Sequence, residues 1–78
     1  MKENVIKVDP EILGGTPVFN GTRVPIEILF DHLESGINID GFLNDYPSVS
    51  REQVIELLEM IGQLFSAEKI SKIYEIAS

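Results

Sequence analysis

The sequence contains no cysteine, and among its 78 residues there is one histidine and only six lysines or arginines. Without cysteine, the chain can form neither a disulfide framework nor a thiolate zinc site. A single histidine with no convergent serine leaves no recognisable catalytic set. The sequence therefore predicts a protein that is not an enzyme and that holds no metal, cofactor or small-molecule substrate.

Long hydrophobic runs are also missing. The N-terminal stretch MKENVIKVDP has no apolar run of signal-peptide length, and no later segment is long enough to span a bilayer. We therefore expect a soluble, cytoplasmic protein without a membrane partner.

Positive charge is scarce, because six basic residues stand against thirteen acidic ones and give a net charge of −7. Affinity for nucleic acid in general comes from neutralising phosphates with lysine and arginine, so this balance opposes it and favours a basic protein partner. A chain this short forms one domain, and because its core is small we expect self-association to add to its stability.

The sequence pattern of the first third of the chain predicts β structure. An apolar run from Val5 to Val8 ends at Asp9-Pro10, which is typical of a strand followed by a turn. Further on, Asn20-Gly21 separates two short β-prone runs, which predicts a hairpin with a type I′ turn. In that register Phe19 faces Thr22, and Val18 faces Arg23.

The glycine-rich stretch LGGTPVFNGTRVPIE invites comparison with a phosphate-binding P-loop. That loop needs a lysine directly after its second glycine, whereas Gly21 is followed by Thr22 and Arg23. The spacing from Gly15 to Gly21 is also one residue too long. These glycines are therefore interpreted as turn residues.

Three helices follow, each with local start and stop signals. The first begins at Pro25 and ends at Gly36, the second runs from its cap Asn38 to Tyr46-Pro47, and the third begins at Ser50, where Gln53 completes a capping box. Their apolar stripes recur with helical spacing. The stripes consist of Ile26, Leu29, Phe30 and Leu33, then Ile39, Phe42 and Leu43, then Val54, Leu57, Leu58 and Ile61. His32 lies off the first stripe, which predicts an exposed side chain.

A fourth helix is expected after Ser66, either separate from the third or continuous with it, because Ile70, Ile73, Tyr74 and Ala77 repeat the helical spacing. The second and third helices have the order and lengths of a helix-turn-helix. The single domain, residues 1–78, then divides into a β strand and hairpin arm (1–24), a helix-turn-helix core (25–65) and a C-terminal helix (66–78).

The stretch from Asp9 to Ile61 resembles the family known as domain of unknown function 433. The resemblance rests on Thr16-Pro17 after Gly15, the triplet Gly21-Thr22-Arg23, Gly36, and Tyr46-Pro47. It implies a mainly α fold, namely a homeodomain-like three-helix core with an N-terminal β hairpin, often dimeric. Members of the family look like noncatalytic antitoxins encoded beside PIN-like nucleases, so the resemblance implies a nuclease as partner.

Arg23, from the family triplet, has two interpretations. It either contacts a partner or a phosphate, or it stabilises the fold by donating to loop carbonyls or to a carboxylate such as that of Glu27. The second interpretation is favoured, because a five-donor guanidinium beside glycine-rich turns readily finds backbone acceptors.

The side chains at the start of the third helix bear on two hypotheses, namely DNA binding and binding to a basic nuclease. Arg51 and Gln53 could hydrogen-bond to DNA bases, but Glu52, Glu56 and Glu59 would meet the phosphates with like charge. The glutamates form either an ordinary solvated face or a docking surface for a basic nuclease. The leading hypothesis is therefore an antitoxin-like protein that binds its partner through Arg23 and these three glutamates.

Two alternatives stay open. One is a DNA-binding, autoregulatory repressor whose candidate contacts are Lys2, Lys7, Arg23, Arg51 and Gln53. The other is a homomeric module without a nuclease partner. We also predict a homodimer, because two apolar sets lie near the chain ends, where a lone domain would have difficulty covering them. These sets are Val5, Ile6 and Val8, and Ile70, Ile73 and Tyr74.

Overall fold

The computed structural model describes residues 4–66 together with residues 68 and 75. The described part contains the strands β1 (Ile6–Lys7) and β2 (Val18–Phe19), a short 3-10 turn (Leu13–Gly15), and the helices α1 (Ile26–Glu34), α2 (Ile39–Asp45) and α3 (Arg51–Leu64). The fold is mainly α with a small antiparallel sheet, as the sequence predicts. The predicted C-terminal helix (66–78) falls almost entirely outside the described residues.

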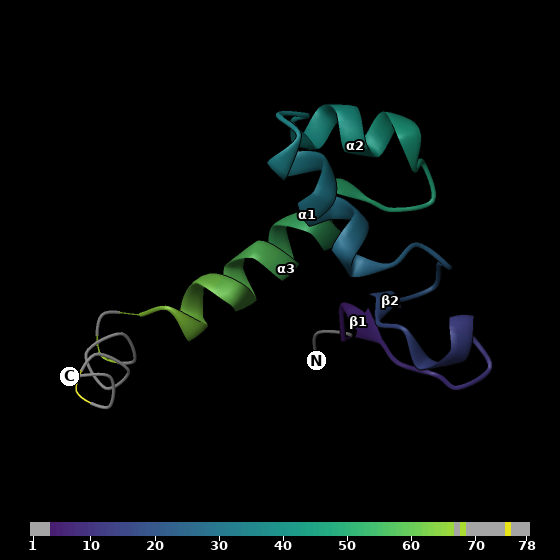
Figure 1. Cartoon of the computed structure of the whole chain (residues 1–78), viewed down its shortest axis with the longest axis horizontal. Helices are drawn as coiled ribbons and strands as arrows, with labels where there is room; N and C mark the ends of the chain where they lie inside the picture. Colours follow the sequence, from purple (N-terminus) through teal and green to yellow (C-terminus); the bar gives the residue numbers. More distant parts are fainter. Residues whose placement is uncertain (1–3, 67, 69–74, 76–78) are drawn as a thin grey trace.

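α1 and α2 lie above the two strands in the view of Figure 1, and α3 begins between α1 and the strands and then extends away from both. β1 pairs antiparallel with β2, so that Ile6 lies opposite Phe19 and Lys7 lies opposite Val18. A further antiparallel bridge joins Val18 to Pro25, directly before α1. β2 is therefore the centre of a short three-part ladder that ties the N-terminal segment to the first helix.

The helix boundaries follow the local signals closely. The Asn38 side chain accepts a hydrogen bond from the Gly41 backbone N–H at 2.9 Å, as expected for the cap of α2. Both halves of the predicted capping box of α3 are present. Gly36 has a φ of 85° and donates to the Leu33 carbonyl, so the chain leaves α1 through a conformation that favours glycine.

The predicted hairpin register was wrong by two residues. The Phe19 N–H donates to the Val24 carbonyl at 3.0 Å, and Val18 bridges Pro25, so neither residue faces its expected partner. Gly21 has a positive φ of 82°, whereas Asn20 does not, which is the pattern of a type II rather than a type I′ turn. The Thr22 hydroxyl donates to the Phe19 carbonyl and accepts from the Val24 N–H, and this holds residues 22 and 23 in the loop.

The core forms where the three helices meet the small sheet. Its buried apolar side chains are Val5, Val18, Phe19, Val24, Leu29, Phe42, Val49, Val54 and Leu57. The first two predicted helical stripes each have one fully buried member, the third has two, and most other members pack against the cluster. Leu33 departs from the prediction, because it lies at the surface and is 36% exposed.

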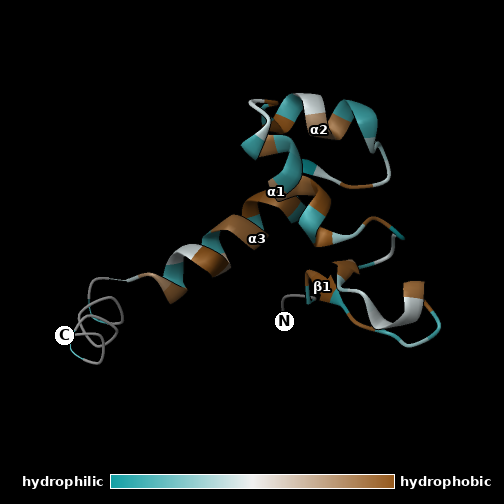
Figure 2. Cartoon of the chain, in the orientation of Figure 1, coloured by the Kyte–Doolittle hydropathy of each residue, from teal (hydrophilic) through white to brown (hydrophobic). Residues whose placement is uncertain are grey.

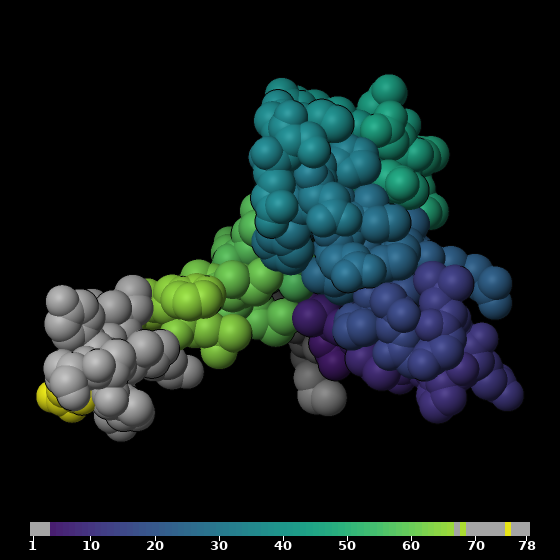
Figure 3. Space-filling view, viewed as in Figure 1, coloured from purple at the N-terminus to yellow at the C-terminus, as the bar shows by residue number. Residues whose placement is uncertain are grey.

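α3 extends beyond this core. Figure 3 shows it projecting as an arm from the body formed by the strands, α1 and α2, and Figure 2 shows apolar positions recurring along its length. Val54 and Leu57 are buried near its start, whereas Leu64 is 54% exposed at its end. The apolar stripe of α3 is thus longer than the core that the described residues provide for it.

Candidate functional site

The beginning of α3 is tied to the β region by Gln53. Its Oε1 accepts from the Ser50 N–H at 3.0 Å, and its Nε2 donates to the Asn20 carbonyl at 2.8 Å across 33 positions of sequence. The side chain is partly buried. The amide predicted as a possible base contact is therefore engaged at both ends in holding the Asn20–Gly21 turn against the helix.

Arg51, the other predicted base contact, is engaged as well. Its guanidinium forms an ion pair with Asp40 on α2, and both side chains are exposed. Exposed ion pairs contribute little to stability. The pair nevertheless supplies Arg51 with a carboxylate partner from its own chain.

The three glutamates lie together on α3, as the helical spacing predicts. Positions 52, 56 and 59 follow one line along a helix, opposite to the buried Val54 and Leu57. Glu52 and Glu59 are exposed, and Glu56 is partly exposed. We call these three residues the acidic ridge, and it is available to a partner along half the length of the helix.

Lys7 and Arg23 meet at one pocket. This pocket has a volume of about 440 Å³. Four segments line it, namely β1, the segment after β1, the 20–23 loop and the connection between α2 and α3. The lining residues are Lys7, Ile12, Asn20, Gly21, Thr22, Arg23 and Ser48. Both basic side chains are exposed. Within the described part of the chain, the Arg23 guanidinium has neither a hydrogen bond nor an ion pair, so the favoured stabilising contact with loop carbonyls or Glu27 does not form there.

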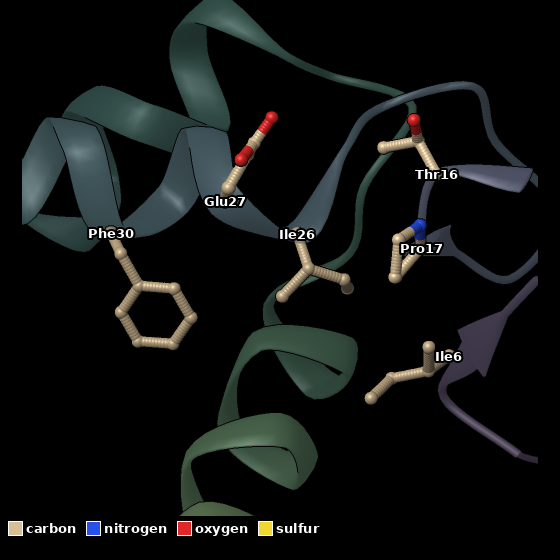
Figure 4. A pocket seen from close by; sticks show the side chains of 6 residues that line it. All are labelled: Ile6, Thr16, Pro17, Ile26, Glu27 and Phe30. Carbon is tan, nitrogen blue, oxygen red and sulfur yellow. The ribbon is translucent and has the colours of Figure 1, made fainter. Parts of the chain in front are cut away.

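Glu27 instead lines a second pocket on the opposite side of the ladder. This hollow of about 300 Å³ lies between β1, the segment before β2, and the first turns of α1. Figure 4 shows Ile6, Pro17, Ile26 and Phe30 around it, with Glu27 and Thr16 at its polar margin. It is a mainly apolar depression with one carboxylate.

The prediction that His32 is exposed was wrong. Only 16% of the side chain is accessible, and its Nε2 lies 3.0 Å from an oxygen of Asp45. Its Nδ1 lies 2.9 Å from the Ile28 carbonyl oxygen, and its ring packs edge-on against Phe42 and Tyr46. Both ring nitrogens thus face oxygen acceptors, which gives His32 a structural position between α1 and the end of α2.

The residues predicted at a dimer interface are distributed differently. Val5 is 7% exposed and belongs to the core of its own chain, so it is not available to a second subunit. Ile6 is half-buried, whereas Val8 is exposed. Ile70, Ile73 and Tyr74, like the predicted DNA contact Lys2, lie outside the described residues.

No group of three or more histidine, cysteine, aspartate or glutamate side chains in the described ranges is placed to hold a metal ion. Among the same residues, no helix is both long and apolar enough to cross a membrane.

A protein-family model matches most of the fold just described. The family described as "Protein of unknown function (DUF433)" matches residues 6–60, from β1 through most of α3. The chain belongs to the DUF433 family. The resemblance drawn from the Gly-Thr-Arg and Tyr-Pro elements is thereby confirmed.

The "Uncharacterized protein y4eO" of Sinorhizobium fredii is 36% identical to this chain over 50 residues, which are 64% of this chain and 23% of that protein. The chain therefore spans less than a quarter of the length of that relative. No solved structure matches the chain significantly.

The DUF433 elements now have structural roles. Gly21 supplies the positive φ of the loop, Gly36 ends α1, and Tyr46 caps α2 and packs against His32 and Phe42. Arg23 has no such role in the described part of the fold. Its convergence with Lys7 was not predicted, because only the strand pairing brings together two residues sixteen positions apart.

Proposed function

We propose that this DUF433 protein is a noncatalytic, antitoxin-like regulator that binds and restrains a PIN-like nuclease through its acidic ridge. The observation that supports the proposal most is the difference at α3 between the groups that could bind DNA and the groups that could bind a protein. The groups that could read DNA, Arg51 and Gln53, are engaged with their own chain, whereas the ridge glutamates are accessible.

Charge supports a protein partner over DNA as well. A nuclease presents basic side chains around its substrate-binding entrance, and an acidic protein steers toward such a surface. The DNA-binding repressor is the second candidate, and it rests on Lys7 and Arg23, which share a pocket and carry no carboxylate partner in the described part of the chain.

Replacing the whole ridge should weaken the nuclease complex. We expect Glu52→Gln, Glu56→Gln and Glu59→Gln together to reduce affinity by roughly tenfold to a hundredfold, since each exposed ion pair contributes about 0.5–1 kcal/mol. The measurement is coexpression with the product of the neighbouring gene, followed by size-exclusion chromatography, calorimetry and a nuclease assay.

A matched control removes the same charge elsewhere. Glu11→Gln, Asp31→Asn and Glu34→Gln replace three exposed carboxylates that lie off α3, and this variant should retain the complex. An equal loss of affinity for the nuclease in both variants would show that net charge, and not the acidic ridge, causes the effect. If the unmodified protein formed no complex and left nuclease activity intact, the proposal would be wrong.

We also propose that the protein is a homodimer and that the end of α3 contributes to its interface. Leu64 and Phe65 lie seven residues after Leu57 and Leu58, so they continue the apolar stripe, yet they are 54% and 59% exposed. Exposed apolar side chains grouped in this way are typical of a surface that another protein covers. A two-fold axis would let the two arms cover each other.

Light scattering should therefore give a dimer mass, with a melting temperature that falls on dilution. Leu64→Ser with Phe65→Ser should shift the mass to that of a monomer. Ile37→Ser, which changes an exposed apolar residue between α1 and α2, should leave the dimer unchanged. A monomer mass for the unmodified protein, with a melting temperature independent of concentration, contradicts the proposal.

A further inference from the structure

Unpaired positive charge gathers at one place on this acidic protein. The described residues include three lysines or arginines, which are Lys7, Arg23 and Arg51. Arg51 pairs with Asp40, whereas neither Lys7 nor Arg23 forms an ion pair in the part of the chain described. These two line the same pocket of about 440 Å³, and no carboxylate lines it with them.

The ladder explains why they converge. Lys7 lies opposite Val18 in the sheet, and Val18 lies opposite Pro25. Residues directly opposite one another in a ladder lie side by side. Arg23 lies in the loop two positions before Pro25, so the strand pairing brings this loop beside Lys7, and both residues line the same pocket.

The loop that carries Arg23 is held by several hydrogen bonds. Asn20 donates from Nδ2 to the Asn4 carbonyl at 3.0 Å, and its own carbonyl accepts from Gln53 at 2.8 Å. The Thr22 hydroxyl bonds to Phe19 and Val24 on either side of the turn. A site whose backbone is already ordered loses less conformational entropy when a ligand binds.

The side chains that line the pocket include the kinds of group that bind an oxyanion. Arg23 offers a planar fork of donors, Lys7 a second positive charge from another segment, and Ser48 a hydroxyl. A carboxylate needs one cation, whereas a phosphomonoester carries nearly two negative charges at neutral pH. We propose that this pocket binds the phosphate group of a small phosphomonoester, and that Ile12 contacts the organic part of that ligand.

The remaining charge of the molecule favours a small ligand over a nucleic acid. With a net charge of −7, the surface around the two cations repels a polymer whose other phosphates must lie along it. A small phosphomonoester places its charge only in the pocket. The proposed site is distinct from the acidic ridge, so its test is independent of the nuclease partner.

The test is an NMR titration of the full chain at constant ionic strength with inorganic phosphate, with adenosine monophosphate and with acetate. We expect saturable shifts at the amides of Lys7, Gly21, Arg23 and Ser48 with both phosphate probes and much weaker binding of acetate. Arg23→Gln and Lys7→Gln should each weaken phosphate binding by about tenfold, corresponding to one charge-assisted contact.

Arg51→Gln is the matched control, because it removes the same charge from an exposed arginine outside the pocket, and its affinity should stay within about twofold of the unmodified protein. The spectra themselves report whether each variant is folded. The proposal is overturned if the shifts do not saturate, if Arg51→Gln weakens binding as much as Arg23→Gln, or if acetate binds as tightly as phosphate. Binding of a 5′-phosphorylated oligonucleotide about tenfold tighter than the mononucleotide would overturn the small-ligand assignment in favour of nucleic acid.

Discussion

Replacing Phe42 with alanine is expected to destabilise the protein by about 3–5 kcal/mol, because the change leaves a cavity in the core as well as removing buried apolar surface. Phe42 is completely buried, and its ring lies 5.9 Å from that of Phe19, 5.4 Å from that of His32 and 5.4 Å from that of Tyr46. It thus joins β2, α1 and the end of α2. Small domains have a total stability of roughly 5–15 kcal/mol, so the variant should be largely unfolded in mild denaturant.

Urea unfolding followed by circular dichroism measures this loss. Ile55→Ala is a suitable control, because Ile55 lies on α3 and is 43% exposed, and its truncation should change stability by less than about 1 kcal/mol. Phe42→Leu, which retains most of the volume, should fall between the two. Equal losses for Phe42→Ala and Ile55→Ala would show that Phe42 is not the centre of the core.

Gln53→Ala is expected to cost about 1–3 kcal/mol, because it leaves the Ser50 N–H and the Asn20 carbonyl without their partners. The same substitution should loosen the 20–23 loop, since the Asn20 contact is the one described side-chain bond from α3 to that turn. Hydrogen exchange at Gly21 and Thr22 measures the local effect, and urea unfolding measures the total.

Gln53→Glu separates the two contacts. Glutamate keeps an oxygen for the Ser50 N–H but has no donor for the Asn20 carbonyl, so this variant should retain the helix cap and lose the tie to the loop. We expect its stability to lie between those of the unmodified protein and Gln53→Ala, with exchange at Gly21 as fast as in the alanine variant. Slow exchange in Gln53→Glu would show that the Asn20 contact does not hold the turn.

His32 illustrates why part of this structure could not be anticipated. Its place on α1 follows from the helical period, and a position off the apolar stripe predicts exposure. The end of α2 folds back over that position and brings Asp45, Phe42 and Tyr46 around the ring. The partial burial of His32 therefore depends on how two helices pack and not on the period of either one.

The candidate site also has one part that the sequence predicts and one part that it does not. The acidic ridge could be predicted, because residues 52, 56 and 59 lie on one helix and their common face follows from its period. The pocket of Lys7 and Arg23 could not, since it depends on strand pairing and on a turn whose register differs by two residues from the expected one. An Asn-Gly pair is compatible with more than one turn type, and the turn type sets which residues face each other.

Local sequence signals suffice to predict the helix ends and the buried stripe of α3. They are the cap at Asn38, the capping box of Ser50 and Gln53, and the end of α2 at Tyr46-Pro47. These signals are local because helix hydrogen bonds join residues four apart. Tertiary packing sets the sheet register, the contact of Gln53 with Asn20, the partial enclosure of His32, and the convergence of Lys7 with Arg23. Each of these joins residues far apart in the chain, and such contacts depend on how whole elements pack, which no short pattern of residues records.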